Sequence, residues 1–206
     1  MLSMEVLKAH YKEYATRPDS RVADRERAKK SIVKYVLQKT GFKANKGPVK
    51  IVVLGTSDRR YLAVHRRVFE EILGCKTDVK TFDVDTEHLG GESGTEITHD
   101  TTKPFPDAPY DIVFSHELMK FLTEEEQLIT IINSYNALGR DGIAMHILHN
   151  PSILGTPQLK SWQHRVNPDG LISSLKKEGI EAAKLVFDSE TDIDWAVKTT
   201  VIVLQK

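Results

Sequence analysis

Three apolar runs of the chain end in polar side chains whose types suit ligand binding and acid–base chemistry. Such runs are typical of buried strands, and the carboxyl ends of parallel strands meet at one edge of a sheet, where ligands bind. Carboxylates at that edge accept hydrogen bonds from a ligand, and an imidazole, whose unperturbed pKa lies near neutrality, can serve as a general base. The residues singled out by this pattern are Asp83, Asp100, Thr101, Ser115 and His116, with His116 as the candidate catalytic base.

A turn after an earlier apolar run offers another candidate binding element. The segment VVLGTSDRRY places Gly55 and Ser57 at alternate positions after the run at 49–54. Small residues let the backbone approach a ligand closely, and the helix that follows presents its N-terminus to a polar group. Arg59, however, puts a long cation into the same turn. A plain strand-to-helix turn, capped by Ser57 or Asp58, is the alternative interpretation.

Other positions have ordinary structural explanations beside the functional ones. An exposed loop acid would account for Asp83, and a helix N-cap would account for Ser115. His146 lies inside an apolar run and is expected to pack in the core. His149 and His164 follow it, but no His-x-x-x-His or mixed carboxylate pattern accompanies them, so we expect no metal site.

The elements that would position these residues alternate between strands and helices. Hydrophobic periodicity predicts helices over 2–15, 21–40, 61–73 and 168–177, with a further helix after residue 117, and strands over 49–54, 78–84, 95–98, 110–114, 143–148, 183–187 and 198–204. The short acidic segment 188–194 between the last two strands suits an antiparallel pair. The order predicts an α/β fold, with a helical N-terminal extension over 1–47 and a sheet domain over 48–206.

The part from 48 to 206 resembles a class I S-adenosylmethionine-dependent methyltransferase, a Rossmann-like domain. The resemblance rests on VVLGTSDRRY, FDVD, ITHD and YDIVF and on the terminal pair, since a nicotinamide-binding domain normally ends in parallel units. It implies a doubly wound sheet of about seven strands with an antiparallel last strand, and S-adenosylmethionine as cofactor. The cofactor-binding residues that it implies are Gly55, Ser57, Asp83 at the ribose, Asp100 at the adenine, Thr101, and Ser115 near the methionine end.

Two functions follow from this resemblance. The first is methyl transfer from S-adenosylmethionine to a small-molecule acceptor, because the Asn/Asp-Pro-Pro-aromatic tetrapeptide of amino-group methyltransferases does not follow the fourth strand. The second is a catalytically inactive binding or scaffold protein, because Val53, Ser57 and Arg59 depart from the acidic and glycine positions of the family. A nicotinamide-dependent oxidoreductase is disfavoured, since the chain has no G-x-G-x-x-G motif.

Charge and composition limit the remaining classes. The formal net charge is zero, which argues against bulk nucleic-acid binding. Residues 1–50 nevertheless hold 13 Lys or Arg against 5 Asp or Glu, so a nucleic-acid partner of this basic segment stays open. The single cysteine, Cys75, permits no internal disulfide, and no apolar run approaches the roughly 20 residues of a membrane span. We expect a cytoplasmic protein without a membrane partner, and the sequence indicates no oligomeric state.

Overall fold

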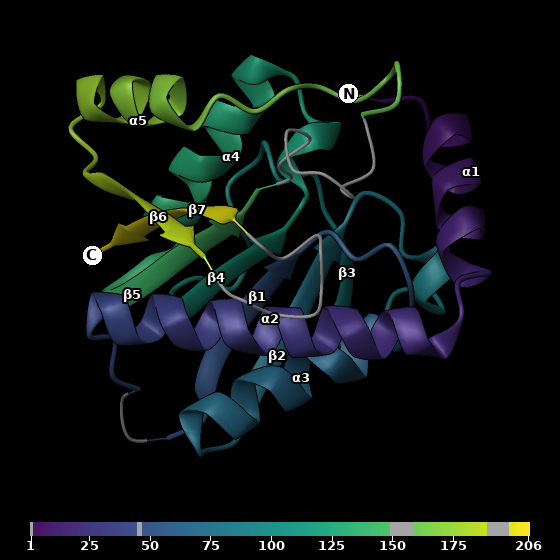
Figure 1. Cartoon of the computed structure of the whole chain (residues 1–206), viewed down its shortest axis with the longest axis horizontal. Helices are drawn as coiled ribbons and strands as arrows, with labels where there is room; N and C mark the ends of the chain where they lie inside the picture. The colour runs from purple at the N-terminus through teal and green to yellow at the C-terminus, as the bar shows by residue number, and fades with distance from the viewer. Residues whose placement is uncertain (1, 45–46, 149–158, 189–197) are drawn as a thin grey trace.

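The computed structural model describes residues 2–44, 47–148, 159–188 and 198–206 and contains a seven-stranded sheet of order β3-β2-β1-β4-β5-β7-β6 (Figure 1). The strands are β1 (Val49–Leu54), β2 (Thr77–Asp83), β3 (Glu96–Thr98), β4 (Tyr110–His116), β5 (Leu138–Ile147), β6 (Ala182–Phe187) and β7 (Thr199–Gln205). The helices are α1 (Met4–Ala15), α2 (Asp19–Thr40), α3 (Arg60–Leu73), α4 (Glu124–Asn136) and α5 (Pro168–Lys177), with short 3-10 turns η1 (Glu87–Leu89) and η2 (Met119–Phe121).

The sheet is parallel except for its last strand. β1 pairs in parallel with β2 and with β4, β2 pairs in parallel with β3, and β4 with β5. β7 runs antiparallel between β5 and β6. The predicted α/β fold, a doubly wound sheet of about seven strands with an antiparallel last strand, is therefore confirmed. The chain builds the sheet outward in one direction from β1 and then in the other from β4, so the topological switch lies between these two strands.

Helices cover both faces of the sheet, as a parallel sheet requires. Figure 1 shows α2 and α3 on one side and α4 and α5 on the other. The residues of β1 alternate between the two cores, because successive strand side chains point to opposite faces. Ile51 and Val53 join the core that contains α2 and α3, whereas Val52 and Leu54 join the core beneath α4 and α5. With both faces filled by apolar side chains, polar residues collect at the strand ends.

The first two helices have well-defined ends. Ser3 caps α1 by accepting a hydrogen bond from the backbone N–H of Val6. Gly41 ends α2 with a φ of 67°, the left-handed cap that its type and position predict. α1 lies at the right-hand end of the molecule in Figure 1, whereas α2 runs along the sheet. None of the helices in the described part of the chain combines the length and the apolar character that a membrane crossing requires.

The structure corrects two predicted boundaries that affect the site. β4 runs to residue 116 rather than ending at 114, because its last two residues pair with β5. The strand predicted over 143–148 begins earlier, because residues 138–142 form the first half of β5, whose pairing with β4 shifts in register there. The predicted acidic connection at 188–194 lies outside the described residues from residue 189 onward, and so does His149.

Candidate functional site

A cavity opens at the carboxyl ends of the strands, beside the switch point between β1 and β4. Its walls come from α1, from the segments that follow β1, β2 and β3, and from the chain between the end of β4 and the start of α4. The cavity and the open space at its mouth together hold about 740 Å³. Of the residues predicted from the sequence, those that line it are Gly55, Ser57, Asp83, Asp100, Thr101 and His116. Ser115 is not among the lining residues.

The turn after β1 brings the backbone to the cavity. Gly55 has a φ of 73°, a conformation that favours glycine, and its N–H donates to the carbonyl of Phe82 at 2.7 Å. A Cβ at Gly55 would lie 3.0 Å from Cδ1 of Leu118. Glycine is therefore needed here both for the backbone conformation and for the close approach of the segment after β4.

The polar residues of this turn divide their tasks. Ser57 lines the cavity, and its Oγ lies 3.4 Å from Nε2 of His10. Asp58 accepts from the N–H of Arg60, the first residue of α3, at 2.8 Å and pairs with the Arg60 guanidinium. Arg59 is not a lining residue, and its guanidinium lies within 3.6 Å of the position of a Cβ built on Gly90. Arg59, which stands where the methyltransferase pattern has a glycine, therefore points toward the loop at Gly90 and not into the cavity.

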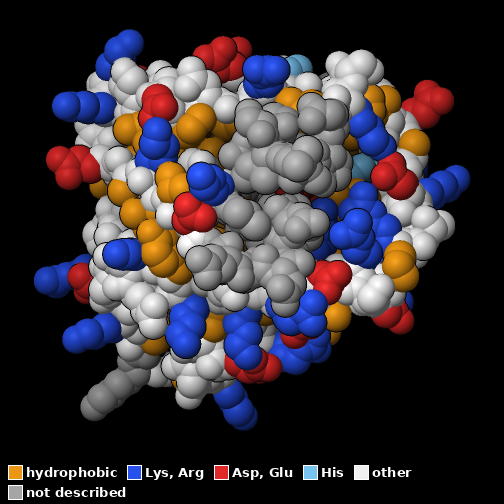
Figure 2. Space-filling view, viewed as in Figure 1, with side chains coloured by type: hydrophobic (Ala, Val, Ile, Leu, Met, Phe, Trp, Pro, Cys, Tyr) orange, Lys and Arg blue, Asp and Glu red, His pale blue; other side chains and the backbone are white. Residues whose placement is uncertain are grey.

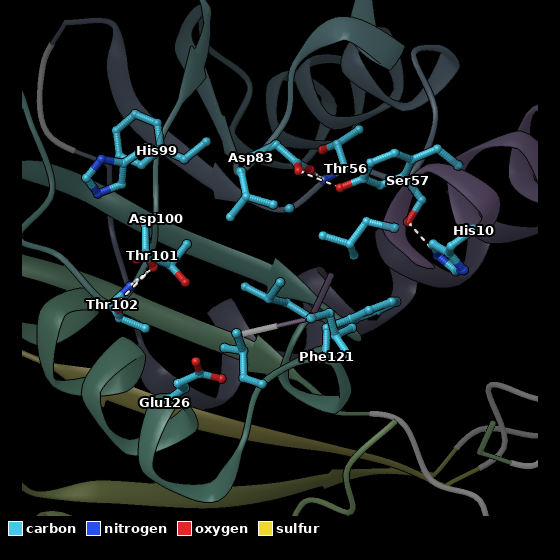
Figure 3. Close-up of a pocket in the computed structure, with 18 of the residues that line it drawn as sticks. His10, Thr56, Ser57, Asp83, His99, Asp100, Thr101, Thr102, Phe121 and Glu126 are labelled. Atoms are coloured by element: carbon cyan, nitrogen blue, oxygen red, sulfur yellow. Dashed lines mark hydrogen bonds between the residues drawn. The ribbon is translucent and has the colours of Figure 1, made fainter. Parts of the chain in front are cut away.

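Asp83, at the end of β2, organises the polar contacts of the cavity (Figure 3). Its side chain is buried, with 6% exposed, which excludes the alternative of an exposed loop acid. Oδ2 accepts from the N–H of Thr56 at 2.8 Å, and Oδ1 accepts from the hydroxyl of Tyr11 at 2.8 Å. Burial raises the pKa of Asp83, while the hydrogen bond from the Thr56 N–H and those from other donors oppose the rise. One carboxylate therefore ties β2, the turn after β1 and α1 together.

The segment after β3 forms another wall of the cavity. Asp100 Oδ1 accepts from the N–H of Thr102 at 2.9 Å and from its hydroxyl at 2.8 Å, which fixes the carboxylate in a local turn. The hydroxyl of Thr101 is 3.1 Å from that of Thr130 in α4, and both residues are buried. In Figure 3, Asp100, Thr101 and Thr102 lie across the cavity from His10. The loop is thus held from both sides and presents a carboxylate beside an apolar surface.

Strand alternation separates Ser115 from His116. Ser115 is fully buried on the α4 and α5 side, where its hydroxyl lies 2.9 Å from Nδ1 of His146. Because β4 continues through both residues, Ser115 is not a helix N-cap, and its predicted contact with the cofactor stays a prediction. His116 points the other way and lines the cavity. Burial, with a contribution from the charge of Lys29, lowers the pKa of His116 well below its usual value, so the imidazole is neutral.

α1 supplies lining residues that the sequence did not identify. The ring of His10 lies 4.4 Å from that of Tyr14, 5.0 Å from Phe121 and 5.9 Å from Trp162, between centroids. Burial, with a contribution from Lys120, lowers the pKa of His10 to about 4. The sequence did offer a clue to these residues. The buried face of α1 carries His10, Tyr11 and Tyr14, whose rings end in polar atoms, whereas a face that serves only for packing would carry aliphatic side chains.

Tyr11 closes the cavity from the same helix. Its ring stacks on His88 at 3.6 Å between centroids with an interplanar angle of 7°. Nε2 of His88 in turn lies 2.6 Å from the carbonyl oxygen of Thr56. His146, by contrast, is fully buried in the core, as predicted. No group of three or more metal-binding side chains is found among the described residues.

Comparisons with known proteins bear on the architecture. No protein-family model and no curated protein matches the chain. It is similar to the structure of magnesium protoporphyrin IX methyltransferase (ChlM) from Synechocystis PCC 6803 with bound S-adenosylmethionine, with a TM-score of 0.58 and 11% identity over 89% of this chain and 80% of that chain. It is also similar to the N-methyltransferase NodS from Bradyrhizobium japonicum WM9 in complex with S-adenosylhomocysteine. The TM-score is 0.57 and the sequence identity 12%, over 98% of this chain and 97% of that chain.

A third similar structure is the plantazolicin methyltransferase BpumL with S-adenosylhomocysteine, with a TM-score of 0.59 and 13% identity over 98% of this chain and 96% of that chain. The strand order and the antiparallel last strand agree with these structures. At such identities the similarity establishes the fold, and the chain has the fold of class I S-adenosylmethionine-dependent methyltransferases.

Proposed function

We propose that the protein is an S-adenosylmethionine-dependent methyltransferase that acts on a small-molecule acceptor. The observation that carries the proposal is the buried carboxylate of Asp83, which stands beside the turn after β1 and inside a cavity at the switch point of the sheet. Three structures of similar fold, ChlM, NodS and BpumL, were solved with S-adenosylmethionine or S-adenosylhomocysteine, which supports the same cofactor here.

The lining residues fit this cofactor. Asp83 would accept the ribose hydroxyls, Asp100 and Thr101 would hold the adenine, and the turn at Gly55 would pass beside the methionine part. Two buried atoms next to the cavity, Oγ1 of Thr56 and Nδ1 of His10, have no hydrogen-bond partner among the described residues. Buried polar atoms are rarely left unpaired, so these atoms are suited to meet a ligand.

Positioning is the main contribution of the chain to the reaction. The bound cofactor supplies a methyl group activated on a sulfonium, and an enzyme accelerates its transfer by aligning the acceptor and excluding water. α1 contributes Tyr11 and His10 to the cavity wall and would limit the access of water to a bound cofactor. His116 is neutral, since burial lowers its pKa, and a strongly lowered pKa makes a weak base. His116 therefore orients an acceptor by a hydrogen bond more effectively than it removes a proton.

Calorimetric titration with S-adenosylhomocysteine and with S-adenosylmethionine tests the proposal. We expect binding to the native protein and binding weaker by about tenfold or more in Asp83→Asn, because a hydrogen bond to a charged group contributes roughly 1.5–3 kcal/mol. Asparagine keeps the size of the side chain and can still accept from Thr56. The matched control is Asp78→Asn, an exposed acid at the other end of β2, which should leave the affinity unchanged.

The titration also separates the two functions that the sequence left open. An absence of heat up to millimolar ligand from a folded sample would contradict the methyltransferase proposal and favour a binding or scaffold protein. Equal weakening by Asp78→Asn would mean that the loss reflects the strand and not the cofactor site.

A further inference from the structure

His10 is a polar side chain in an apolar part of the cavity. The lining residues of this part come from α1 and from the segment after β4, and they are Leu7, Leu118, Phe121 and Leu122. His10 itself is 4% exposed. Figure 3 shows it reaching from α1 toward Ser57, at the opposite end of the cavity from Asp100. A polar ring at a buried apolar position needs a hydrogen-bonding partner, which the protein or a ligand has to supply.

The described residues supply only part of this partner. Nε2 of His10 lies 3.4 Å from Oγ of Ser57, at the long limit of a hydrogen bond, and Nδ1 has no partner among the described residues. Burial lowers the pKa of His10 to about 4, so the ring is neutral and has one N–H donor and one acceptor nitrogen. In either tautomer one nitrogen is left for a bound molecule. A hydroxyl group suits both tautomers, because it donates as well as accepts.

Aromatic rings from three segments of the chain surround this imidazole. Between centroids, the ring of His10 lies 4.4 Å from Tyr14, 5.0 Å from Phe121 and 5.9 Å from Trp162. Phe121 lines the cavity, and the ring of Trp162 lies 5.6 Å from it. An apolar wall that contains flat rings and a single polar group suits a small molecule that carries a ring of its own.

The charges of the lining favour a neutral group beside His10. Among the described residues, the cavity is lined by no lysine and no arginine. Figure 2 shows Lys and Arg side chains on the outer surface at the right, where Figure 1 places α1. The lining carboxylates are Asp83, Asp100 and Glu126, and they belong to other walls, at the end of β2, after β3 and at the start of α4. A charged group next to His10 would therefore meet no lining side chain of opposite charge there.

We infer that His10 binds the methyl acceptor and that the acceptor is a neutral aromatic molecule with a hydroxyl group. The inference rests on the proposed function, since it names the substrate class of that same site. The acceptor's ring lies against Phe121 and the neighbouring leucines, and its hydroxyl meets the nitrogen of His10 that the described residues leave unpaired. Ser57, which Nε2 of His10 approaches, belongs to the turn proposed to pass beside the methionine part of the cofactor, so the bound hydroxyl lies toward the methyl-bearing end.

Phenol and toluene are the probes, because they have nearly the same shape and differ by a hydroxyl in place of a methyl group. Their dissociation constants are measured by NMR titration, with and without S-adenosylhomocysteine, and the ratio of the toluene constant to the phenol constant reports the hydroxyl contact. In His10→Phe and His10→Leu, which remove both nitrogens, we expect this ratio to fall about fivefold, the usual effect of one neutral hydrogen bond.

Two further variants serve as controls. His10→Gln keeps a donor and an acceptor and should retain at least about half of the native ratio. His99→Phe exchanges the lining histidine on the opposite side of the cavity, next to Asp100, and should leave the ratio unchanged (Figure 3). Circular dichroism of each variant verifies that it is folded before it is titrated.

A native ratio in His10→Phe and His10→Leu would overturn the inference. An equal fall in His99→Phe would also overturn it, because the preference for a hydroxyl would then come from the cavity as a whole. A fall in His10→Gln as large as that in His10→Leu would do the same, since packing of the ring and not its hydrogen bond would then be responsible. The cofactor arm keeps the two proposals apart. A ratio that depends on His10 without binding of S-adenosylhomocysteine would leave the hydroxyl site standing and remove the methyltransferase function, and binding of S-adenosylhomocysteine with a ratio independent of His10 would do the reverse.

Discussion

At the scale of single residues, Lys29 is the most unusual side chain of the protein. It extends from α2 into the layer between that helix, α3 and the end of β4, where its amine contacts His65. Burial, reinforced by the nearby charge of Arg25, lowers the pKa of Lys29 to about 7. Near neutral pH the amine therefore changes its charge inside the protein, beside His65, and this charge contributes to the lowered pKa of the cavity-lining His116. A surface lysine would stay charged throughout this range.

This pKa predicts that the protein becomes more stable as the pH rises above neutrality. The unfolded amine titrates at about 10.5 and the folded amine at about 7, so the unfolded chain binds more protons between these values and the free energy of unfolding increases with pH. Urea unfolding at pH 7 and pH 9 measures the increase. In Lys29→Met we expect it to be smaller by on the order of 1 kcal/mol. Lys30→Met, an exposed neighbour, should keep the native increase, and an unchanged increase in Lys29→Met would contradict the lowered pKa.

At the scale of elements, the docking of α1 determines the state of the cavity. Tyr11 donates to Asp83, the carboxylate proposed to accept ribose hydroxyls, and its ring stacks on His88. Lys8 adds an ion pair with Glu87 at 3.0 Å. α1 thus occupies a hydrogen-bonding position that a bound cofactor would need. A bound ribose would compete with the Tyr11 hydroxyl for this carboxylate.

Tyr11→Phe is therefore expected to tighten the binding of S-adenosylhomocysteine, by roughly two- to tenfold, because the binding-competent arrangement no longer competes with the hydroxyl. Calorimetry gives the affinity, and the phenylalanine keeps the stack on His88. Tyr35→Phe removes a hydroxyl that donates to Val186 on β6, away from the cavity, and should have no effect. Weaker binding in Tyr11→Phe would show that the hydroxyl contacts the ligand instead of competing with it.

The same element explains which parts of the site were predictable from the sequence. Gly55, Asp83 and Asp100 follow strands, and strand periodicity with parallel order is sufficient to bring them to one edge. Tyr11 was not predicted, because its contact with Asp83 joins residues 72 positions apart and depends on where α1 docks. The strand end before Ser115 was predicted too early, because the end of β4 is set by its pairing with β5, a contact that local periodicity does not contain.

At the scale of the whole molecule, buried neutral histidines are spread through the fold. They lie in α1 (His10), α3 (His65), β4 (His116) and β5 (His146), and burial lowers the pKa of each, to about 4 for His10 and about 3 for His146. The two apolar cores share the strands of one sheet, so we expect the described elements to unfold together. Protonation of any of these rings then destabilises the entire domain.

These histidines predict a loss of stability in mild acid. Their folded pKa values lie below the unfolded value of about 6.5, so their contribution is complete above pH 6.5 and is lost as the pH falls toward the folded values. Urea unfolding at pH 7 and pH 5 should show a decrease of a few kcal/mol, since each fully shifted group contributes up to about 2 kcal/mol over this interval. His146→Gln, which keeps a polar group near Ser115, should reduce the decrease. A free energy of unfolding that is equal at the two pH values would contradict the prediction.

The position of α1 has a practical consequence for handling the protein. Leu2 and Leu7 line the cavity, so any segment fused ahead of the first helix emerges beside the opening. β7 runs antiparallel to β5, and its Gln205 lies opposite Ile143, near the start of the buried part of β5. The chain therefore ends on the side of the sheet away from the carboxyl ends of the parallel strands, where the cavity lies. Affinity tags and fluorescent labels are therefore best placed after Lys206, where they leave the cavity opening clear. The same tags ahead of α1 would lie beside the opening and obstruct ligand binding.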